Sequence, residues 1–269
     1  MIARGYAVVG KVGARVSERL DGTVALVTGA SSGIGEATAR LLSEKGAAVA
    51  IVARRKDRLE RLAGEIKGKG GRALVLETDV TDPDQAIAAV ERTVAELGRL
   101  DTLINNAGVM LLGPATEAPL EEWERTVDLN LKGLLYCTHA ALPHLLAAAA
   151  QEPRRVADLV NISSVAGRKA NAGSGIYNLS KFGVGAFSES LRMELAKRHV
   201  RVSLVEPGFV KTELSNHIRD GIRETARQRY VGVELLESED IADAIAYIVT
   251  RPRRMAVNEL LVRPTEQEP

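Results

Sequence analysis

The residues best suited to chemistry stand close together in the stretch that contains Ser164, Tyr177 and Lys181. A helix through Tyr177 and Lys181 would place both side chains on one face, about 5–6 Å apart at Cβ. A nearby ammonium favours the phenolate, which predicts that Lys181 lowers the pKa of Tyr177 from its usual value of about 10. Tyr177 is therefore a candidate general acid/base, and Ser164, which follows the apolar run 158–162, is a candidate for holding the substrate oxygen.

Each of these residues also has a simpler interpretation. The spacing Tyr-x-x-x-Lys is common by chance, and on its own it more often marks a half-buried tyrosine and a solvated lysine. A pair of serines after a strand usually forms a turn or caps a helix. The catalytic interpretation therefore depends on a redox cofactor site elsewhere in the chain.

The beginning of the chain supplies a candidate for such a site. Residues 23–28 form an apolar run typical of a buried parallel strand, and residues 36–42 have helical spacing. The turn between them would let the backbone approach a pyrophosphate at a helix N-terminus. Its candidate binding residues are Gly29, Ser31, Ser32, Gly33, Ile34 and Gly35. Because the spacing is Gly-x-x-x-Gly-x-Gly rather than Gly-x-Gly-x-x-Gly, a purely structural turn is the alternative.

The residues after a second predicted strand, 47–53, indicate which dinucleotide would bind. A site for NAD usually has an acidic residue here that accepts a hydrogen bond from the ribose 2′-hydroxyl. This chain has Arg54 and Arg55, and no carboxylate before Asp57. Guanidinium groups bind a 2′-phosphate through charge-assisted hydrogen bonds, so the sequence predicts NADP rather than NAD. The alternative is that both arginines are solvated charges at the start of a helix.

Composition and charge narrow the class of protein. The chain has 269 residues, of which 45% are hydrophobic and 26% charged, and a net charge of +1, which is typical of a globular protein and unlike a dedicated nucleic-acid binder. The single cysteine, Cys137, excludes an internal disulfide and predicts a reducing, cytoplasmic location. No apolar run reaches the roughly 18 residues that span a bilayer. We expect residues 1–21 to be a loosely ordered extension and residues 22–269 to form one domain.

Strands and helices are predicted to alternate through the rest of the chain. Further strands are expected at 73–76, 102–104, 158–162, 200–206 and 258–262. This pattern predicts an α/β fold: a single-domain, Rossmann-type, doubly wound parallel sheet of about seven strands flanked by helices. Its ligand crevice should lie at the carboxyl ends of the strands, where the strand order reverses.

In combination, these motifs resemble the short-chain dehydrogenase/reductase family, in its NADP-preferring branch. The resemblance covers roughly residues 21–250. It is carried by residues 28–35, Asp79, residues 105–108, Asn130, Ser164, Tyr177, Lys181, Pro207 and Gly208. One departure is Ser32, because many NADP-preferring members have a basic residue there.

The resemblance implies a role for each matching residue. Asn130, Ser164, Tyr177 and Lys181 would be catalytic, with Asn130 holding a water that links Lys181 to solvent. Beyond the glycine turn, the implied cofactor contacts are Arg54, Arg55, Asp79, Val80, Asn106, Ala107, Gly108, Tyr177, Lys181, Pro207, Gly208, Val210 and Thr212. The implied reaction is hydride transfer between NADP(H) and a ketone, aldehyde or alcohol, with β-ketoacyl thioesters as alternative substrates. The implied assembly is a homodimer or homotetramer formed through helices near 140–150 and 178–195.

The substrate is less well defined by the sequence. A charged segment, 213–237, is a candidate lid. Candidate wall residues are Met110, Leu111, Leu112, Arg168, Lys169, Asn171 and Phe209. Arg168 and Lys169 would suit a substrate carboxylate, unless both face solvent.

Two other classes of protein stay open at this point. One is a catalytically silent NADP-sensing protein that has kept the dinucleotide fold. The other is a metal-dependent hydrolase or lyase, although the histidines fit no common metal motif. The histidines in question are His139, His144, His199 and His217.

Overall fold

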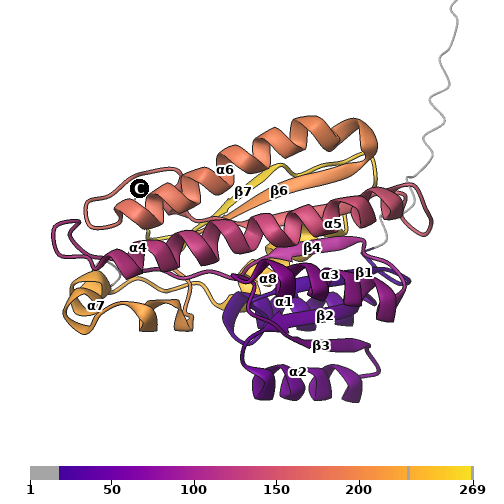
Figure 1. The fold of residues 1–269 in the computed structure, drawn as a ribbon, viewed down its shortest axis with the longest axis horizontal. Coiled ribbons are helices and arrows are strands. Elements are labelled where there is room, and N and C mark those ends of the chain that lie inside the picture. Colours follow the sequence, from indigo (N-terminus) through magenta and orange to yellow (C-terminus); the bar gives the residue numbers. More distant parts are fainter. Residues whose placement is uncertain (1–17, 229–230, 268–269) are drawn as a thin grey trace, which may run out of the picture.

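A computed structural model describes residues 18–228 and 231–267, and these form one parallel sheet with helices on both faces (Figure 1). The strand order is β3-β2-β1-β4-β5-β6-β7. The strands are β1 (Val24–Thr28), β2 (Ala48–Ala53), β3 (Ala73–Glu77), β4 (Thr102–Asn105), β5 (Ala157–Ile162), β6 (Val200–Pro207) and β7 (Glu259–Val262). Each predicted strand is confirmed, with its ends within one residue of the expected positions.

The helices follow the strands in alternation. They are α1 (Gly33–Glu44), α2 (Lys56–Gly68), α3 (Pro83–Leu97), α4 (Leu120–Val127), α5 (Gly133–Ala149), α6 (Gly175–Leu195), α7 (Asp220–Arg227) and α8 (Ser238–Val249). Four short segments are a π-helix, η1 (Asp128–Lys132), and the 3₁₀ helices η2 (Val165–Gly167), η3 (Ala196–Arg198) and η4 (Glu213–His217). Two of these short segments, η1 and η2, carry or follow predicted catalytic residues.

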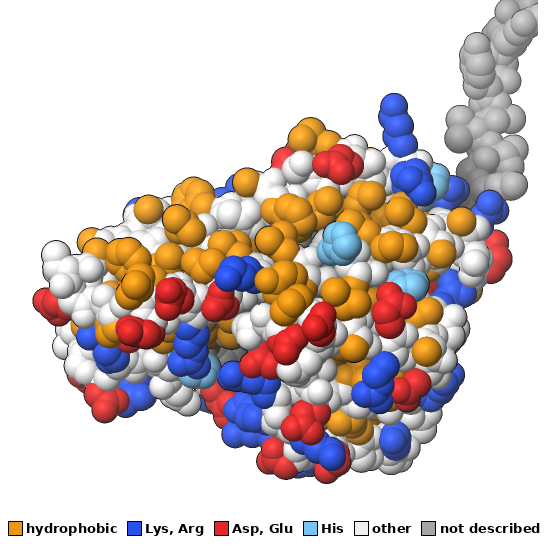
Figure 2. Space-filling model, in the orientation of Figure 1, with side chains coloured by type: hydrophobic (Ala, Val, Ile, Leu, Met, Phe, Trp, Pro, Cys, Tyr) orange, Lys and Arg blue, Asp and Glu red, His pale blue; other side chains and the backbone are white. Residues whose placement is uncertain are grey.

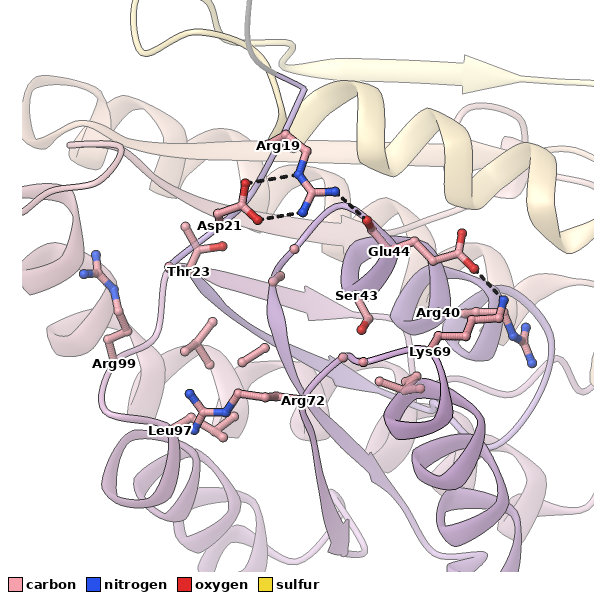
Figure 3. Close-up of a pocket in the computed structure, with 18 of the residues that line it drawn as sticks. Arg19, Asp21, Thr23, Arg40, Ser43, Glu44, Lys69, Arg72, Leu97 and Arg99 are labelled. Atoms are coloured by element: carbon pink, nitrogen blue, oxygen red, sulfur yellow. Dashed lines mark hydrogen bonds and ion pairs between the residues drawn. The ribbon is translucent and has the colours of Figure 1, made fainter.

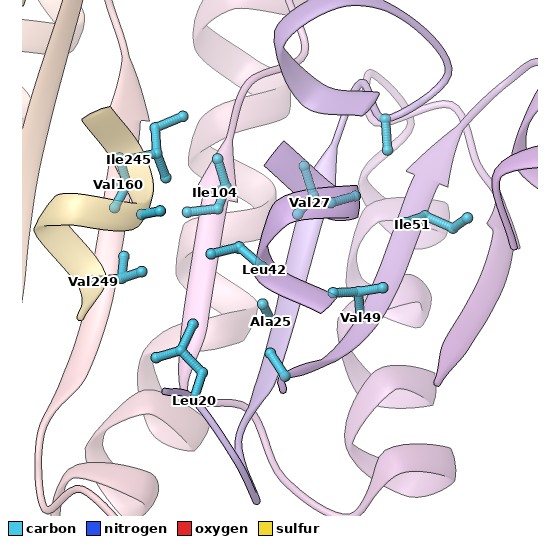
Figure 4. Close-up of a cluster of buried hydrophobic side chains, with 14 of the residues drawn as sticks. Leu20, Ala25, Val27, Leu42, Val49, Ile51, Ile104, Val160, Ile245 and Val249 are labelled. Atoms are coloured by element: carbon cyan, nitrogen blue, oxygen red, sulfur yellow. The ribbon is translucent and has the colours of Figure 1, made fainter. Parts of the chain in front are cut away.

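The strands are apolar without interruption because helices cover both faces of the sheet. Successive strand residues point to opposite faces, so Val27 packs under α1, α2 and α8, whereas Leu26 packs under α3, α5 and α6. Figure 4 shows Leu42 of α1 beside Val27 and Ile104 of the sheet, and Ile245 of α8 beside Val160 of β5. Burying this apolar surface on both faces supplies the main favourable term in the stability of the domain.

The strand order changes direction at β1, which pairs with β2 on one side and with β4 on the other. The loops after β1 and β4 therefore diverge and open a crevice at the carboxyl ends of the strands. The predicted doubly wound topology is confirmed. It places every loop that carries a predicted site residue at one edge of the sheet.

The described part of the expected N-terminal extension is packed against the domain. Leu20 is buried in the hydrophobic core, and its N–H donates to the carbonyl of Lys45 at 2.8 Å. Residues 1–17 lie outside the described residues. Within the described residues, no helix combines the length and the apolar character that crossing a membrane requires.

Candidate active site

The glycine turn after β1 has a backbone that only glycine adopts readily. Gly29 and Gly33 have φ of 66° and 58°, in the left-handed region. A Cβ on Gly35 would lie 2.5 Å from the carbonyl oxygen of Gly29, which is closer than any real contact. The turn therefore exposes bare backbone at the N-terminus of α1, which is the form of site that a diphosphate needs. Ile34, next to Gly35, packs against the core and anchors this first turn.

The loop after β4 is fixed to the glycine turn through the last residue of β1. The hydroxyl of Thr28 accepts hydrogen bonds from the N–H groups of Asn106 and Ala107, both at 3.0 Å. The amide of Asn106 donates back to the carbonyl of Thr28 at 2.9 Å. Gly108 follows, where an added Cβ would lie 3.2 Å from Oδ1 of Asn130. The two loops that border the crevice are thus held as one unit.

The two arginines after β2 are placed differently. Arg55 donates from Nε and Nη2 to the hydroxyl of Ser31 at 3.0 and 2.9 Å, and from Nη2 to that of Ser32 at 2.7 Å. Its Nη1 donates to the carboxylate of Glu213 at 2.8 Å. Arg54 extends further into solvent, with Nη1 3.8 Å from Asp79. Of the two, only Arg55 contacts the glycine turn and is fixed by several hydrogen bonds, whereas Arg54 lies toward Asp79.

Other predicted cofactor residues follow the carboxyl ends of β3 and β6. Asp79, after β3, accepts from the N–H and the hydroxyl of Thr81 at 3.0 and 2.8 Å, and the neighbouring Val80 is buried. Thr212 caps η4, and a Cβ on Gly33 would lie 3.2 Å from its methyl carbon. The remaining predicted residues, Pro207, Gly208 and Val210, lead from the end of β6 to Thr212.

Tyr177 and Lys181 lie in the first two turns of α6, as the sequence predicts, and both side chains are buried. Nζ of Lys181 lies 5.7 Å from the centre of the Tyr177 ring. It donates a hydrogen bond to the carbonyl of Ile162, the last residue of β5, at 2.9 Å. The lysine thus joins the catalytic helix to the strand that leads to Ser164.

The Tyr177 pKa is not lowered overall, as the sequence predicted, because burial outweighs the groups that favour the phenolate. Burial raises the pKa of Tyr177 to about 12, while an interaction with Ser164 acts in the opposite direction. Burial also lowers the pKa of Lys181 to about 8. Both shifts have one cause, because loss of hydration disfavours the charged form of each group. At neutral pH the phenol therefore keeps its proton.

Asn130 lies in the π-helix between α4 and α5 and is buried. Its Oδ1 accepts from the N–H of Val109 at 2.8 Å, and its Nδ2 donates to the carbonyl of Val109 at 2.9 Å and to the hydroxyl of Ser180 at 3.1 Å. The hydroxyl of Ser180 in turn donates to the carbonyl of Tyr177 at 2.8 Å. Asn130 thus connects the loop after β4 to the catalytic helix, and its role in holding a water stays a prediction.

The loop after Ser164 is held by a residue that the sequence did not single out. The hydroxyl of Ser164 accepts from the N–H of Ala166 at 3.1 Å and caps η2. The buried amide of Asn178 donates to the carbonyls of Ala166 and Lys169 at 2.7 and 3.1 Å. Asn178 therefore fixes the Ser164 loop relative to Tyr177. The only sequence signal was a polar residue directly after the candidate tyrosine.

Arg168 does not serve the substrate role that the sequence allowed. Its guanidinium binds the buried carboxylate of Glu206 on β6 through Nε and Nη2, at 2.7 and 2.6 Å, and also pairs with Glu259 of β7. These two carboxylates raise its pKa above the usual value. The expectation that Arg168 binds a substrate carboxylate is wrong, because a buried acid already needs this cation.

The other expected wall residues are distributed between the interior and the surface. Leu111 is buried, Met110 and Leu112 are half-buried, and Lys169 and Asn171 are exposed. Phe209 follows β6, and its N–H donates to the side chain of Gln267 at 2.9 Å. The expected apolar wall is therefore supplied mainly by the loop after β4.

A separate cavity of about 550 Å³ lies at the amino ends of the strands (Figure 3). Arg19 there pairs with Asp21 at 2.6 Å, and Lys69 pairs with Glu44 at 2.8 Å. None of the predicted site residues lines this cavity, so we place the active site at the carboxyl ends. Within residues 18–228 and 231–267, no three His, Cys, Asp or Glu side chains gather closely enough to hold a metal ion.

Comparison with known proteins agrees with this geometry. The sequence model of the family described as short chain dehydrogenase matches residues 23–223. The chain is 40% identical over 248 residues to a glycine betaine reductase from Emericella nidulans; the match covers 92% of this chain but only 19% of that much longer protein.

Two solved structures share the fold over nearly their whole length. The closed form of a serine dehydrogenase complexed with NADP⁺ is 34% identical, with a TM-score of 0.81, and the match covers 92% of this chain and 97% of the other. A 3-ketoacyl-(acyl-carrier-protein) reductase from Brucella melitensis complexed with NADH is 30% identical, with a TM-score of 0.81, covering 92% and 99%.

Proposed function

Since the chain belongs to the short-chain dehydrogenase family, we propose that it is an NADP(H)-dependent ketone or aldehyde reductase in which Tyr177 is the general acid/base. The observation that carries the proposal is the buried phenol of Tyr177, which interacts with Ser164 and keeps its proton at neutral pH. A protonated phenol beside a hydroxyl is the arrangement that the reduction of a carbonyl needs.

The residues at the crevice fit a phosphorylated dinucleotide. The bare backbone of the glycine turn suits a diphosphate, and the guanidinium groups of Arg54 and Arg55 suit a 2′-phosphate. When bound there, NADPH would supply a hydride to the carbonyl carbon. The related serine dehydrogenase was solved with NADP⁺ and the related 3-ketoacyl reductase with NADH, so both cofactors belong in the test.

In the proposed reaction, the side chains of the crevice bind and protonate the substrate oxygen. The hydroxyl of Ser164 holds this oxygen, and the O–H of Tyr177 donates its proton as the carbon receives the hydride. Lys181, whose pKa of about 8 leaves it mostly charged at pH 7, stabilises the phenolate that forms. We assign Asn130 the role of holding the water that returns a proton to Tyr177. The carbonyl substrate thus gains one hydride and one proton and becomes the alcohol.

The substrate class is proposed in two steps. Small ketones and aldehydes come first, because the assigned catalytic groups act only on the C=O group. β-Ketoacyl thioesters come second, and the likeness to a 3-ketoacyl reductase favours them. Arg168 gives no support for a carboxylate-bearing substrate, since it pairs with Glu206 and Glu259.

We also propose that the protein forms a homodimer or homotetramer through α5 and α6. Hydrophobic side chains gather over these helices on the face shown in Figure 2. On α6, Leu179, Phe182 and Met193 are 57%, 45% and 62% exposed. A contiguous apolar surface of this kind is typical of an interface between proteins. Light scattering coupled to gel filtration would measure the mass, and a monomer at micromolar concentration would contradict this assignment.

The decisive experiment is NADPH oxidation over a panel of ketones, aldehydes and β-ketoacyl thioesters. We expect turnover with at least one carbonyl compound, and slower turnover with NADH in place of NADPH. Turnover that survives Tyr177→Phe unchanged would overturn the mechanism. If tight NADPH binding accompanied no turnover on any substrate, the chain would instead be a cofactor-sensing protein.

A further inference from the structure

Glu213, the first residue of η4, binds the arginines at the proposed 2′-phosphate site. Its carboxylate accepts from Nη1 of Arg55 at 2.8 Å, and from Nη1 of Arg58 at 2.8 and 2.9 Å. These two cations hold the pKa of Glu213 near 2, so the carboxylate is charged at every pH at which the protein would work. A cavity of about 530 Å³ opens here, lined by residues that include Ser32, Gly33, Arg58 and Glu213.

Arg55 offers a limited number of donors to any anion. Its Nε and Nη2 donate to the hydroxyls of Ser31 and Ser32, and its Nη1 donates to Glu213. The serines belong to the glycine turn, so these hydrogen bonds hold the guanidinium beside the diphosphate-binding backbone. The remaining nitrogen of the guanidinium, Nη1, donates to the carboxylate of Glu213, so a phosphate that approached Nη1 would meet this carboxylate. A second anion there meets both a competitor for the donor and a charge of the same sign.

Glu213 also starts the segment 213–237, which the sequence marks as a candidate lid. The chain just before this segment is joined to the segment's C-terminal end by a bridge between Val210 and Leu236. The N–H of Lys211 donates to the carbonyl of Leu236 at 2.8 Å, and the N–H of Leu236 donates to that of Phe209 at 3.1 Å. Through its hydrogen bond with Arg55, Glu213 joins the start of the segment to the loop between β2 and α2. Thr212, the residue before Glu213, lies beside Gly33 of the glycine turn.

The hydrogen bond between Glu213 and Arg55 joins side chains that are partly exposed and can therefore separate. The side chains of Arg55 and Glu213 are each 42% exposed. Ion pairs at such positions contribute little to stability, since water and salt screen them. A phosphate carries more charge than a carboxylate and presents three acceptor oxygens, so it can replace Glu213 on the arginines.

We propose that Glu213 is a specificity-determining residue that binds Nη1 of Arg55 and yields it to the 2′-phosphate of NADP(H), which releases η4 (Glu213–His217) from the β2–α2 loop. The inference rests on the proposed role of Arg55 as a 2′-phosphate ligand. Glu213 thereby lowers the affinity for every 2′-phosphorylated nucleotide and leaves the affinity for NAD⁺ unaffected. It also couples occupation of the cofactor site to the freedom of η4.

The test is calorimetric titration of the full-length protein with NADP⁺, NAD⁺ and 2′-AMP. For Glu213→Gln we expect binding of NADP⁺ and 2′-AMP to tighten about fivefold, with the NAD⁺ dissociation constant unchanged. The matched control is Glu224→Gln, which removes an exposed carboxylate from α7 in the same segment and should change none of the three constants. Unchanged or weaker NADP⁺ binding by Glu213→Gln, or an equal gain for NAD⁺, would overturn the inference.

An Arg55→Gln variant separates this inference from the function on which it rests. If Arg55→Gln binds NADP⁺ as well as the wild-type protein does, the assigned phosphate site itself is wrong. If Arg55→Gln loses affinity for NADP⁺ but Glu213→Gln gains none, the phosphate site stands and only the role of Glu213 fails.

Hydrogen exchange tests the release of the segment without any measurement of turnover. Without nucleotide, the amides of residues 213–217 should exchange faster in the Glu213→Gln variant than in the wild-type protein. Adding NADP⁺ to the wild-type protein should have the same effect, and NAD⁺ should not. If the amides of residues 213–217 exchanged equally fast with NADP⁺ and with NAD⁺, or if NADP⁺ alone slowed their exchange, Glu213 would not be released from Arg55.

Discussion

The two walls of the crevice are built on opposite physical principles. One wall, here called the catalytic wall, holds Tyr177 and Lys181. Lys181 is only 7% exposed, and its ammonium donates to a backbone carbonyl. The other, here called the phosphate wall, holds Arg54 and Arg55 at the proposed 2′-phosphate site. The side chain of Arg55 is 42% exposed, and its partners are two hydroxyls and a carboxylate. Burial thus governs the first wall, and exchangeable ion pairs govern the second.

This difference separates the tasks that each wall can perform. Burial moves the pKa of Tyr177 to about 12 and that of Lys181 to about 8, so the proton chemistry is set by a fixed, largely dry environment. Exposed guanidinium groups keep their charge and can change partners at small free-energy cost. We therefore assign the proposed proton transfer to the buried wall and the proposed selection of a phosphorylated cofactor to the exposed one.

The largest expected effect is on the buried wall. Tyr177→Phe removes the only proton that the proposed reaction takes from a side chain, so we expect turnover to fall by about a factor of 10³ while the NADPH dissociation constant stays within about twofold. Steady-state NADPH oxidation and fluorescence titration measure the two quantities. Tyr247→Phe, at an exposed position of α8, is the control and should leave both unchanged. A tenfold loss of NADPH affinity with normal turnover would reverse the assignment.

The pKa of Lys181 predicts a pH dependence of stability. The unfolded chain keeps the lysine proton up to a pH of about 10.5, whereas the folded protein releases it at about 8. Between these values the unfolded state binds more protons, so the free energy of unfolding of the wild-type protein should rise relative to that of Lys181→Met. The gain should total about 3 kcal/mol, measured by denaturant unfolding of both proteins at several pH values. Parallel pH profiles would show that burial does not shift this lysine.

Arg168 tests whether a cation near the crevice belongs to the scaffold. Arg168→Met leaves the carboxylate of Glu206 buried without its bidentate partner, and we expect a loss of about 2 kcal/mol in the free energy of unfolding. It should not raise the KM of carboxylate-bearing substrates relative to neutral ones. Chemical denaturation measures the free energy of unfolding, and steady-state kinetics measures KM for carboxylate-bearing and neutral substrates with both proteins. A selective rise in KM with unchanged stability would restore the substrate role.

The smallest expected effect is at Arg54, on the exposed wall. Its side chain is 63% exposed and lies 3.8 Å from Asp79, so water screens its charge. We expect Arg54→Gln to weaken NADP⁺ binding by about threefold, well below the effect of Arg55→Gln, and to leave NAD⁺ binding unchanged. Calorimetric titration at two salt concentrations would measure both. If Arg54→Gln had the larger effect, Arg54 rather than Arg55 would be the main phosphate ligand.

The sequence predicted those parts of the site that depend on local spacing. The apolar runs gave seven strands, and the positions of Tyr177 and Lys181 gave two side chains on one helix, because strand and helix periods are properties of a short stretch of chain. It failed where residues far apart in the sequence meet. Asn178 was not recognised, and for Arg168 the sequence offered a substrate carboxylate or solvent but not Glu206, because the partners of both residues are set by how loops and strands pack.

What the sequence alone determined was the order of elements, the glycine turn and the identity of the groups available for chemistry. Only the tertiary structure decided their ionisation and their partners. Burial of Tyr177 reversed the direction of the pKa shift that the Tyr177–Lys181 spacing suggested, and Glu213 reached Arg55 from 158 positions away. Hydration and long-range ion pairs depend on the packed structure around a group, and no local pattern of residues contains that information.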